Sequence, residues 1–301
     1  MSRRRVHLLG GFAVFASAGR PLPIARSCRS VLGYLITHRR RSISRVELAE
    51  TLWPEHDGDR ARRCLSTALW RLKKASSSGP PLLAFQGADQ VSFDWHVPLW
   101  VDSIALELRV EPLLHFKPDT LKLEGVKRLE RGVRLYHGDY LTGVYDEWAC
   151  LERQRLRNLY FDGLYQLISA YAAMSNWTAV LQWGRRLSQE EPLREDVHRM
   201  LMRAYLSTGN RAKAIAQYQQ CVSILRGELG VEPMSETQTL YAELLCSSAC
   251  WAAPEPLAIA ATPAYVDHSI ERLRRTLESS RQQLDQAIET LRQASVPHVR
   301  D

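Results

Sequence analysis

The stretch from Ser44 to Lys74 constrains the fold most strongly, because it predicts two short helices joined by a turn. Ser44 and Glu47 have the S-x-x-E spacing of a capping box, in which each side chain bonds to a backbone N–H at the start of a helix. Pro54 predicts the end of this helix, since the residue before a proline disfavours the helical conformation. We expect Asp59 to cap the second helix.

The second helix is predicted to be amphipathic. Its apolar residues recur at spacings of four, four and three, which places them on one face: Ala61, Leu65, Leu69 and Leu72. The other face is polar and basic: Arg62, Arg63, Ser66, Thr67, Trp70, Arg71 and Lys74. Trp70 could contact DNA, but we favour a packing role in which it supports the strands predicted at 82–85 and 91–93 from below.

Strands and a further helix flank this pair. Residues 6–24 alternate as strands do, and their prolines at the end restrict them to a sheet edge. A signal peptide is the alternative, but the apolar part is short and broken by glycines. Residues 27–38 predict a helix, and residues 82–85 and 91–93 predict the two strands of a hairpin called a wing. No run of 18 apolar residues occurs, so no membrane helix is predicted.

The positive charge is confined to the first third of the chain. Residues 1–103 contain 16 Lys and Arg against 8 Asp and Glu, whereas the other residues contain 24 basic and 25 acidic groups. A net charge of +8 on this part indicates that it meets a polyanion. The six cysteines form no CxxC pair, so we expect reduced, packed thiols in a cytoplasmic protein and no metal site.

An internal repeat dominates the rest of the chain, which is predicted to be helical from about residue 119 to residue 250, with helices over 119–136 and from Trp148. Five positions recur 34 residues later: Leu167, Tyr171, Asn176, Val180 and Leu187 correspond to Leu201, Tyr205, Asn210, Ala214 and Cys221. A 34-residue period of paired helices is typical of tetratricopeptide repeats. Two repeats bury little core alone, so flanking helices must complete the stack.

Heptad spacing marks the last part of the chain. Apolar residues recur every seven positions at Ile270, Leu277, Leu284 and Leu291. This pattern favours a coiled-coil helix that pairs two subunits. The alternative is a helix that folds back onto the repeats.

These patterns together predict a mainly α fold in four parts. The predicted domains are a winged helix over 1–103, a tetratricopeptide-like domain over 104–250, a linker over 251–263 and a heptad helix over 264–297.

Several segments carry a resemblance to a known family. They are Val6–Phe12, Ser44–Lys74, His137–Leu141, Asp146–Trp148, Glu152–Arg157, Glu191–Glu195, His198–Met202 and Glu228–Pro233. Through them the chain resembles SARP-type bacterial transcriptional regulators, in which an OmpR-like winged helix precedes a bacterial transcriptional activator domain. The wing departs from that family, because Asp89-Gln90 stands where a Gly-Tyr pair is usual.

A recognition helix needs short polar and guanidinium side chains that reach base edges in the major groove. The residues predicted to contact bases are Arg62, Arg63, Ser66 and Thr67. Those predicted to contact phosphates are Arg39, Arg40, Arg41, Arg71, Lys73 and Lys74. For any one of them the alternative is a solvated surface charge.

The resemblance also implies partners. In OmpR-like activators the turn between the two helices contacts RNA polymerase, which here corresponds to Trp53, Glu55, His56 and Asp57. A simple connector is the alternative. We therefore expect a homodimeric activator that binds double-stranded promoter repeats and recruits RNA polymerase, without a membrane partner.

The sequence has few signals of any other function. No nucleotide-binding, metalloprotease or hydrolase motif occurs, so neither an enzyme nor a cofactor is predicted. A protein-interaction adaptor is the alternative function, with or without a small-molecule effector. Its groove would be lined by aromatic residues, although these are also typical of a core: Tyr171, Tyr205, Tyr218 and Trp177.

Overall fold

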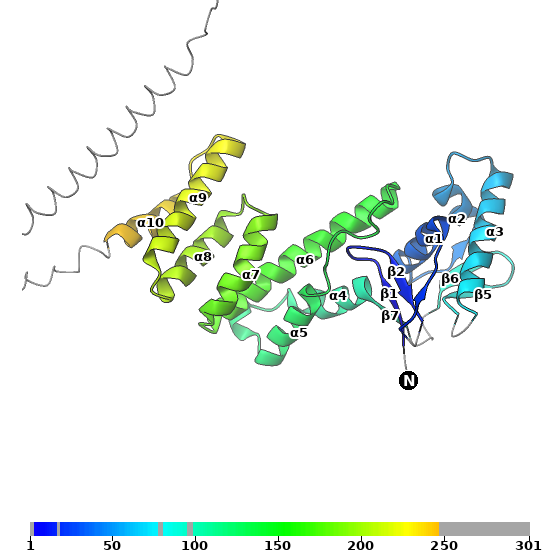
Figure 1. Ribbon diagram of the computed structural model, residues 1–301, viewed down its shortest axis with the longest axis horizontal. Coiled ribbons are helices and arrows are strands. Elements are labelled where there is room, and N and C mark those ends of the chain that lie inside the picture. Colours follow the sequence, from blue (N-terminus) through cyan, green and yellow to red (C-terminus); the bar gives the residue numbers. More distant parts are fainter. Residues whose placement is uncertain (1–2, 17–18, 78–80, 95–98, 247–301) are drawn as a thin grey trace, which may run out of the picture. The chain divides into compact units, whose positions relative to one another are not determined.

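Helices and short strands alternate in the first hundred residues, and helices follow almost without interruption (Figure 1). The computed structural model describes residues 3–16, 19–77, 81–94 and 99–246. Residues 1–242 form one compact unit, and the second unit begins at Glu243. The heptad positions and the predicted linker lie outside the described residues.

Four strands form the first sheet, in the order β3-β2-β1-β7. They are β1 (Arg4–His7), β2 (Ala13–Phe15), β3 (Pro21–Leu22) and β7 (Leu99–Val101). The first three strands are antiparallel neighbours, and β7 pairs parallel to β1. Pro21 lies in the edge strand β3, where its missing N–H costs no internal hydrogen bond.

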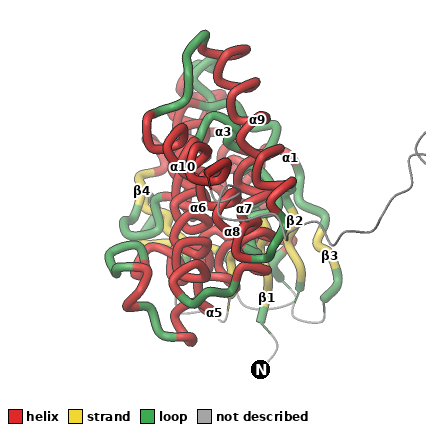
Figure 2. Tube along the Cα trace, turned by 90° about the vertical axis from the view of Figure 1, so that its left-hand side faces the viewer, coloured by secondary structure: helices red, strands yellow, loops and turns green. Residues whose placement is uncertain are grey.

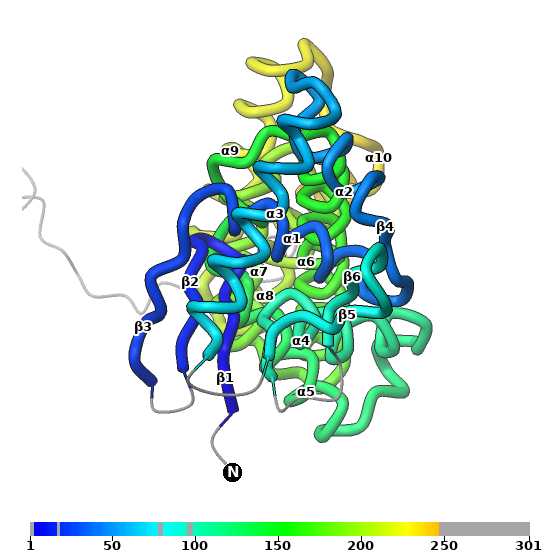
Figure 3. Tube along the Cα trace, turned by 90° about the vertical axis from the view of Figure 1, so that its right-hand side faces the viewer, coloured from blue at the N-terminus to red at the C-terminus, as the bar shows by residue number. Residues whose placement is uncertain are grey.

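Three helices and a second sheet complete the winged helix, as predicted. The elements are α1 (Arg26–Thr37), β4 (Ile43–Ser44), α2 (Arg45–Leu52), α3 (Gly58–Ala75), β5 (Leu83–Gln86) and β6 (Gln90–Phe93). The second sheet has the order β4-β6-β5, so the wing hairpin is anchored to the strand that leads into α2 (Figure 3).

The caps of the two helices differ in part from the prediction. Ser44 accepts the backbone N–H of Glu47 at 3.0 Å, but the Glu47 carboxylate accepts from Arg41 at 2.7 Å. The cap of α3 is Asp57, which accepts the N–H of Arg60 at 2.7 Å, so the prediction of Asp59 was wrong. The helix begins at Gly58, which places Asp59 inside its first turn.

Seven helices make up the second part of the described chain (Figure 2). They are α4 (Asp102–Val110), α5 (Leu123–Val133), α6 (Glu147–Ala173), α7 (Trp177–Glu190), α8 (Glu195–Ser207), α9 (Arg211–Leu229) and α10 (Ser235–Cys246). The helix predicted from residue 119 begins only at Leu123, because short 3-10 turns, Glu111–Leu113 and Pro118–Thr120, and the extended Leu121 precede it.

The 34-residue repeat is confirmed as two helix pairs, α6–α7 and α8–α9, each packed against the next. Asn176 and Asn210 are the corresponding caps of α7 and α9, and their N–H groups bond to Tyr171 O at 2.9 Å and Tyr205 O at 2.7 Å. The residue before each cap has a left-handed backbone, which costs Ser175 more than its counterpart Gly209.

The winged helix and the helical part share a packed boundary inside the first unit. Tyr140 donates its hydroxyl to Gly33 O on α1 at 3.1 Å, and Leu141 N–H donates to Leu8 O at 2.9 Å. Both Tyr140 and Leu141 are buried, so α1 is covered by the chain that leads into α6. This packing fixes the winged helix against the helical part.

The cysteines in the described residues are free thiols, and they are packed only in part. Cys28 and Cys221 are buried, and burial raises the pKa of Cys221 to about 11. Cys64 is half-buried, whereas Cys150 is exposed. Within the described ranges there is no group of three or more metal-ligating side chains, and no helix is long and apolar enough to cross a membrane.

Acidification is expected to destabilise the repeats through His198. This residue is fully buried, with Nε2 at 2.9 Å from Pro192 O and Nδ1 at 2.8 Å from the amide of Gln217. Burial lowers the pKa of His198 below its ordinary value of 6.5, so the unfolded chain takes up the proton first as the pH falls. The stabilising contribution is complete above pH 6.5 and is lost below it.

Urea denaturation at pH 7.5 and at pH 5 would measure this effect. A pKa difference of one between the folded and unfolded states corresponds to about 1.4 kcal/mol. We expect His198→Gln to have a flatter pH dependence than the wild type. The same pH dependence in both proteins would contradict the prediction.

Candidate nucleic-acid interface

Helix α3 presents its polar face to solvent, as the sequence predicted. Ala61, Leu65 and Leu72 are each about 1% exposed or less, so the apolar stripe is fully buried. The four residues predicted to contact bases are all exposed: Arg62, Arg63, Ser66 and Thr67. Two successive turns of α3 therefore offer two guanidinium groups and two hydroxyls on one surface.

Hydrogen bonds within α3 orient these side chains. Ser66 Oγ donates to Arg62 O at 2.8 Å, and Thr67 Oγ1 donates to Arg63 O at 2.9 Å. Each hydroxyl oxygen can still accept a hydrogen bond from a base. Arg62 donates to Asp59 at 2.6 Å, and this pairing lowers the pKa of the Asp59 carboxyl. Arg62 must leave this exposed ion pair in order to reach a base.

A basic pocket of about 300 Å³ lies along the same helix. It joins α3 to the start of α1 and to the turn after α2, and its lining residues are Ser27, Trp53, Arg60, Arg63, Cys64, Thr67 and Arg71. Three guanidinium groups around one hollow make it electropositive, which suits a phosphate oxygen. The structure thus brings Arg63 and Thr67 together with Arg71.

The residues predicted to contact phosphates fall into two sets. Arg40, Arg71, Lys73 and Lys74 are exposed, and Arg41 is exposed with a salt bridge to Glu47. Arg39 is different, because its side chain is only 13% exposed and pairs with Glu107 on α4. Its guanidinium is committed to the boundary with the helical part, so Arg39 is removed from the predicted phosphate contacts.

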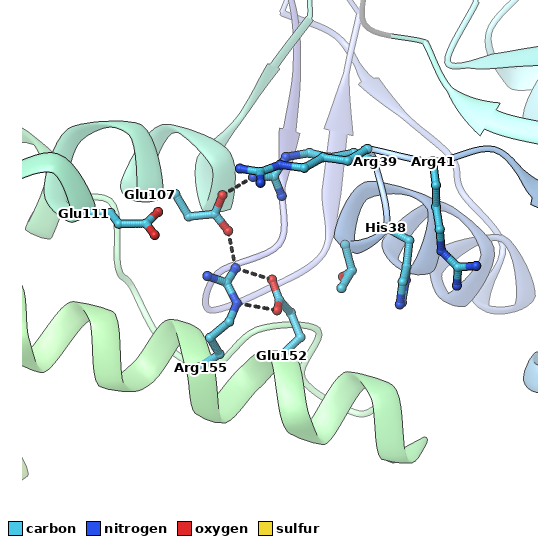
Figure 4. A pocket seen from close by; sticks show the side chains of 9 residues that line it. His38, Arg39, Arg41, Glu107, Glu111, Glu152 and Arg155 are labelled. Carbon is cyan, nitrogen blue, oxygen red and sulfur yellow. Dashed lines mark hydrogen bonds and ion pairs between the residues drawn. The ribbon is translucent and has the colours of Figure 1, made fainter.

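The Glu107 contact belongs to a network of four charges (Figure 4). The Glu107 carboxylate pairs with Arg39 and with Arg155, and Arg155 also donates twice to Glu152 at 2.7 Å. The network joins the turn after α1 to α4 and α6. Sequence reasoning missed the two contacts of Glu107, since Arg39 lies 68 residues and Arg155 48 residues away and no local spacing marks them.

Trp70 does not have the packing role predicted for it. Its side chain is 59% exposed, and Lys74 Nζ lies 5.0 Å from the centroid of its ring. The ring is exposed because it follows Arg63 and Thr67 along the polar face of α3, opposite the buried stripe.

The turn between α2 and α3 consists of Trp53–Asp57. Glu55 and Asp57 are exposed, whereas Trp53 and His56 are half-buried. Asp57 caps α3 and Trp53 lines the basic pocket, so two of the four residues predicted to contact RNA polymerase also have roles within the winged helix.

Arg45 was missed by the sequence reasoning. Its backbone N–H donates to Asp89 O at 2.7 Å, and its guanidinium donates to Ala88 O at 3.5 Å and to Ser66 Oγ at 3.1 Å. It therefore links the wing tip to α3. A basic residue at the first position of a helix was the only local signal.

The predicted aromatic groove is found in a different form. A largely apolar pocket of about 480 Å³ is lined by Trp177, and its other aromatic residue is Tyr165. Tyr171 instead donates to Glu130 at 2.9 Å, Tyr205 is buried, and Tyr218 stacks on Tyr241. None of these three tyrosines lines this pocket, because the tertiary packing gives each of them another partner.

Comparison with known proteins supports the resemblance to bacterial transcriptional regulators. Residues 122–245 match the model of the bacterial transcriptional activator domain. Regulatory protein AfsR of Streptomyces coelicolor is 26% identical over 72% of this chain, although the chain spans only 22% of the length of AfsR. Transcriptional regulatory protein MoaR1 of Mycobacterium tuberculosis is 25% identical, with 75% of each chain covered.

A solved structure shares the fold. Mycobacterium tuberculosis EmbR, in complex with a low-affinity phosphopeptide, superposes with a TM-score of 0.65 at 20% identity, over 82% of this chain and 66% of that chain. The predicted mainly α fold is confirmed for the described residues. These matches confirm the resemblance of this chain to SARP-type bacterial transcriptional regulators.

Proposed function

We propose that this protein is a sequence-specific DNA-binding transcriptional activator that binds promoter repeats as a homodimer and recruits RNA polymerase. The observation that carries the proposal is the exposed face of α3, where Arg62, Arg63, Ser66 and Thr67 lie side by side on successive turns. The relatives named as regulatory proteins support it. The net charge of +8 on residues 1–103 supplies the attraction to a polyanion.

Fluorescence-anisotropy titration with the gene's own upstream region and with mixed genomic fragments tests this proposal. We expect binding that weakens steeply with salt and that is tighter for the upstream fragment, since phosphate contacts release counterions and base contacts discriminate. Absent or salt-insensitive binding would favour the adaptor function. The apolar pocket around Trp177 supports that second function, because paired-helix repeats bind partner peptides in such grooves.

The turn between α2 and α3 is proposed to contact RNA polymerase. Alanine at Glu55 and His56 together is expected to lower transcription in vitro while promoter affinity stays unchanged, because neither residue lines the basic pocket. Asp57 is left intact in this variant, since it caps α3. Full transcription by the variant would make the turn a simple connector.

The heptad residues Ile270, Leu277, Leu284 and Leu291 are proposed to pair two subunits. A chain that ends at Thr262 is expected to sediment as a monomer where the full chain sediments as a dimer. The same oligomeric state for both chains would contradict the pairing. Salt-dependent binding by the shortened chain would then report on DNA binding without the heptad segment.

A further inference from the structure

The wing tip is held by contacts to the helix pair rather than left free. Ser42 Oγ donates to the Gln86 amide oxygen at 3.1 Å, and Ser44 pairs with Gln90 between β4 and β6. Arg45 donates its backbone N–H to Asp89 O, and its guanidinium donates to Ala88 O. The wing is therefore tied to α2 at its tip as well as at its base.

Arg45 also reaches the helix that carries the predicted base contacts. Its Nη2 donates to Ser66 Oγ at 3.1 Å, while Nη1 of the same guanidinium donates to Ala88 O. The planar fork of an arginine can hold two acceptors at once, whereas a lysine ammonium acts as a single point charge. One side chain thus spans the gap between the wing and α3.

Helix formation does not explain an arginine at this position. Arg45 is the first residue of α2, where the helix dipole disfavours positive charge. The nearby Glu47 carboxylate accepts from Arg41, and the acceptors of Arg45 are a hydroxyl and carbonyl oxygens. The hydrogen bonds of Arg45 to the wing and to α3 offset this unfavourable interaction with the helix dipole.

The wing tip itself is poorly suited to DNA. Gly87, Ala88 and Asp89 are exposed, and the Asp89 carboxylate would repel a phosphate. A wing of this charge contributes more by supporting α3 than by following the DNA backbone.

We infer that Arg45 is a positioning residue that fixes the wing against α3, so that Ser66 and the neighbouring turn face the bases in a defined geometry. This inference rests on the proposed function, because it concerns how α3 reads DNA. The Ser66 hydroxyl donates to Arg62 O and accepts from Arg45, so two hydrogen bonds within the protein fix its orientation. The wing thereby restrains the position of α3.

Hydrogen–deuterium exchange on the full chain without DNA tests the contact itself. In Arg45→Lys the charge remains but the fork is lost, so we expect the backbone amide of residue 45, which donates to Asp89 O, to exchange about tenfold faster. Arg60→Lys is the matched control, because Arg60 is exposed on α3 and has no wing contact among the hydrogen bonds given by the structure. Unchanged exchange in Arg45→Lys would overturn the inference.

DNA binding then separates positioning from a direct phosphate contact. For a positioning residue, Arg45→Lys lowers the ratio of specific to non-specific affinity about tenfold, the discrimination of one base contact, and leaves the salt dependence unchanged. For a phosphate contact, Arg45→Lys retains affinity and Arg45→Gln weakens both kinds of DNA alike, with a salt slope reduced by about 1. This second pattern overturns the inference.

The two failures can be told apart. If the wild-type protein binds no DNA, the proposed function fails, but faster exchange of the residue 45 amide in Arg45→Lys still supports the contact. If the wild-type protein binds its upstream fragment specifically and the variant has the same specificity ratio, the positioning role fails and the proposed function stands.

Discussion

Replacement of Asp102 by alanine is expected to lower the free energy of unfolding by about 3–5 kcal/mol, since each buried N–H left without an acceptor costs about 1–3 kcal/mol. The Asp102 carboxylate accepts from Leu8 N at 2.8 and 2.9 Å, from Leu9 N at 3.0 Å and from Ser103 N at 2.8 Å. Its side chain is 3% exposed, so water does not replace these bonds. The end of β1 would lose its attachment to the start of α4.

Urea denaturation at neutral pH measures this loss. Burial raises the pKa of Asp102, and the three N–H groups and His7 oppose that shift. We expect Asp102→Asn, which keeps one acceptor oxygen, to be intermediate. Asp162→Ala, on the exposed side of α6, is the control and should change stability by less than about 0.5 kcal/mol. A loss below about 1 kcal/mol in Asp102→Ala would show that the three N–H groups find other acceptors.

The largest expected effect on binding is the loss of promoter affinity in Arg63→Ala. An arginine that donates twice to a guanine contributes about 1–3 kcal/mol of discrimination, so specific affinity should fall roughly 5- to 150-fold. The loss of specific affinity in Thr67→Ala should lie within the same range, because Thr67 offers both a hydroxyl and a methyl group to the bases. Non-specific affinity should fall much less for Arg63→Ala and stay nearly unchanged for Thr67→Ala, which removes no charge.

Footprinting and anisotropy on the upstream region, against mixed genomic fragments, measure both affinities. Arg131→Ala on α5 is the matched control, since it removes an exposed arginine that lies outside the winged helix. The double variant tests coupling, because Thr67 donates to Arg63 O and the two effects need not add. An unchanged footprint in both single variants would mean that α3 is not the reading helix.

Much of the fold could be predicted because it depends on local spacing. The buried stripe of α3, the proline after α2 and the capping serine each concern residues within a few positions of one another. The 34-residue repeat was equally visible, since both copies place an asparagine cap after the same turn. The predicted cap of α3, Asp59, lies two residues after the observed cap, Asp57. Both residues carry the same side chain, and only the backbone conformation distinguishes them.

The candidate site could be predicted only in part. The sequence indicated which face of α3 is polar, and the structure places all four predicted base-contact residues on the exposed side. It could not indicate that Tyr171 bonds to Glu130 or that Arg45 reaches Ser66. Each of these depends on which element packs beside the residue, and that choice leaves no periodic trace.

The sequence by itself determined the helix pair at 44–74, the wing and the repeats, because hydrophobic periodicity and caps act over distances of one to three turns. Only the tertiary structure decided the role of Arg39, which looked like one of three equivalent basic residues. Its partner Glu107 lies 68 residues away in the sequence. A buried carboxylate needs a positively charged partner, and only the folded structure shows which guanidinium lies beside it. Long-range pairing of charges therefore separated a residue of the domain boundary from those proposed to meet DNA.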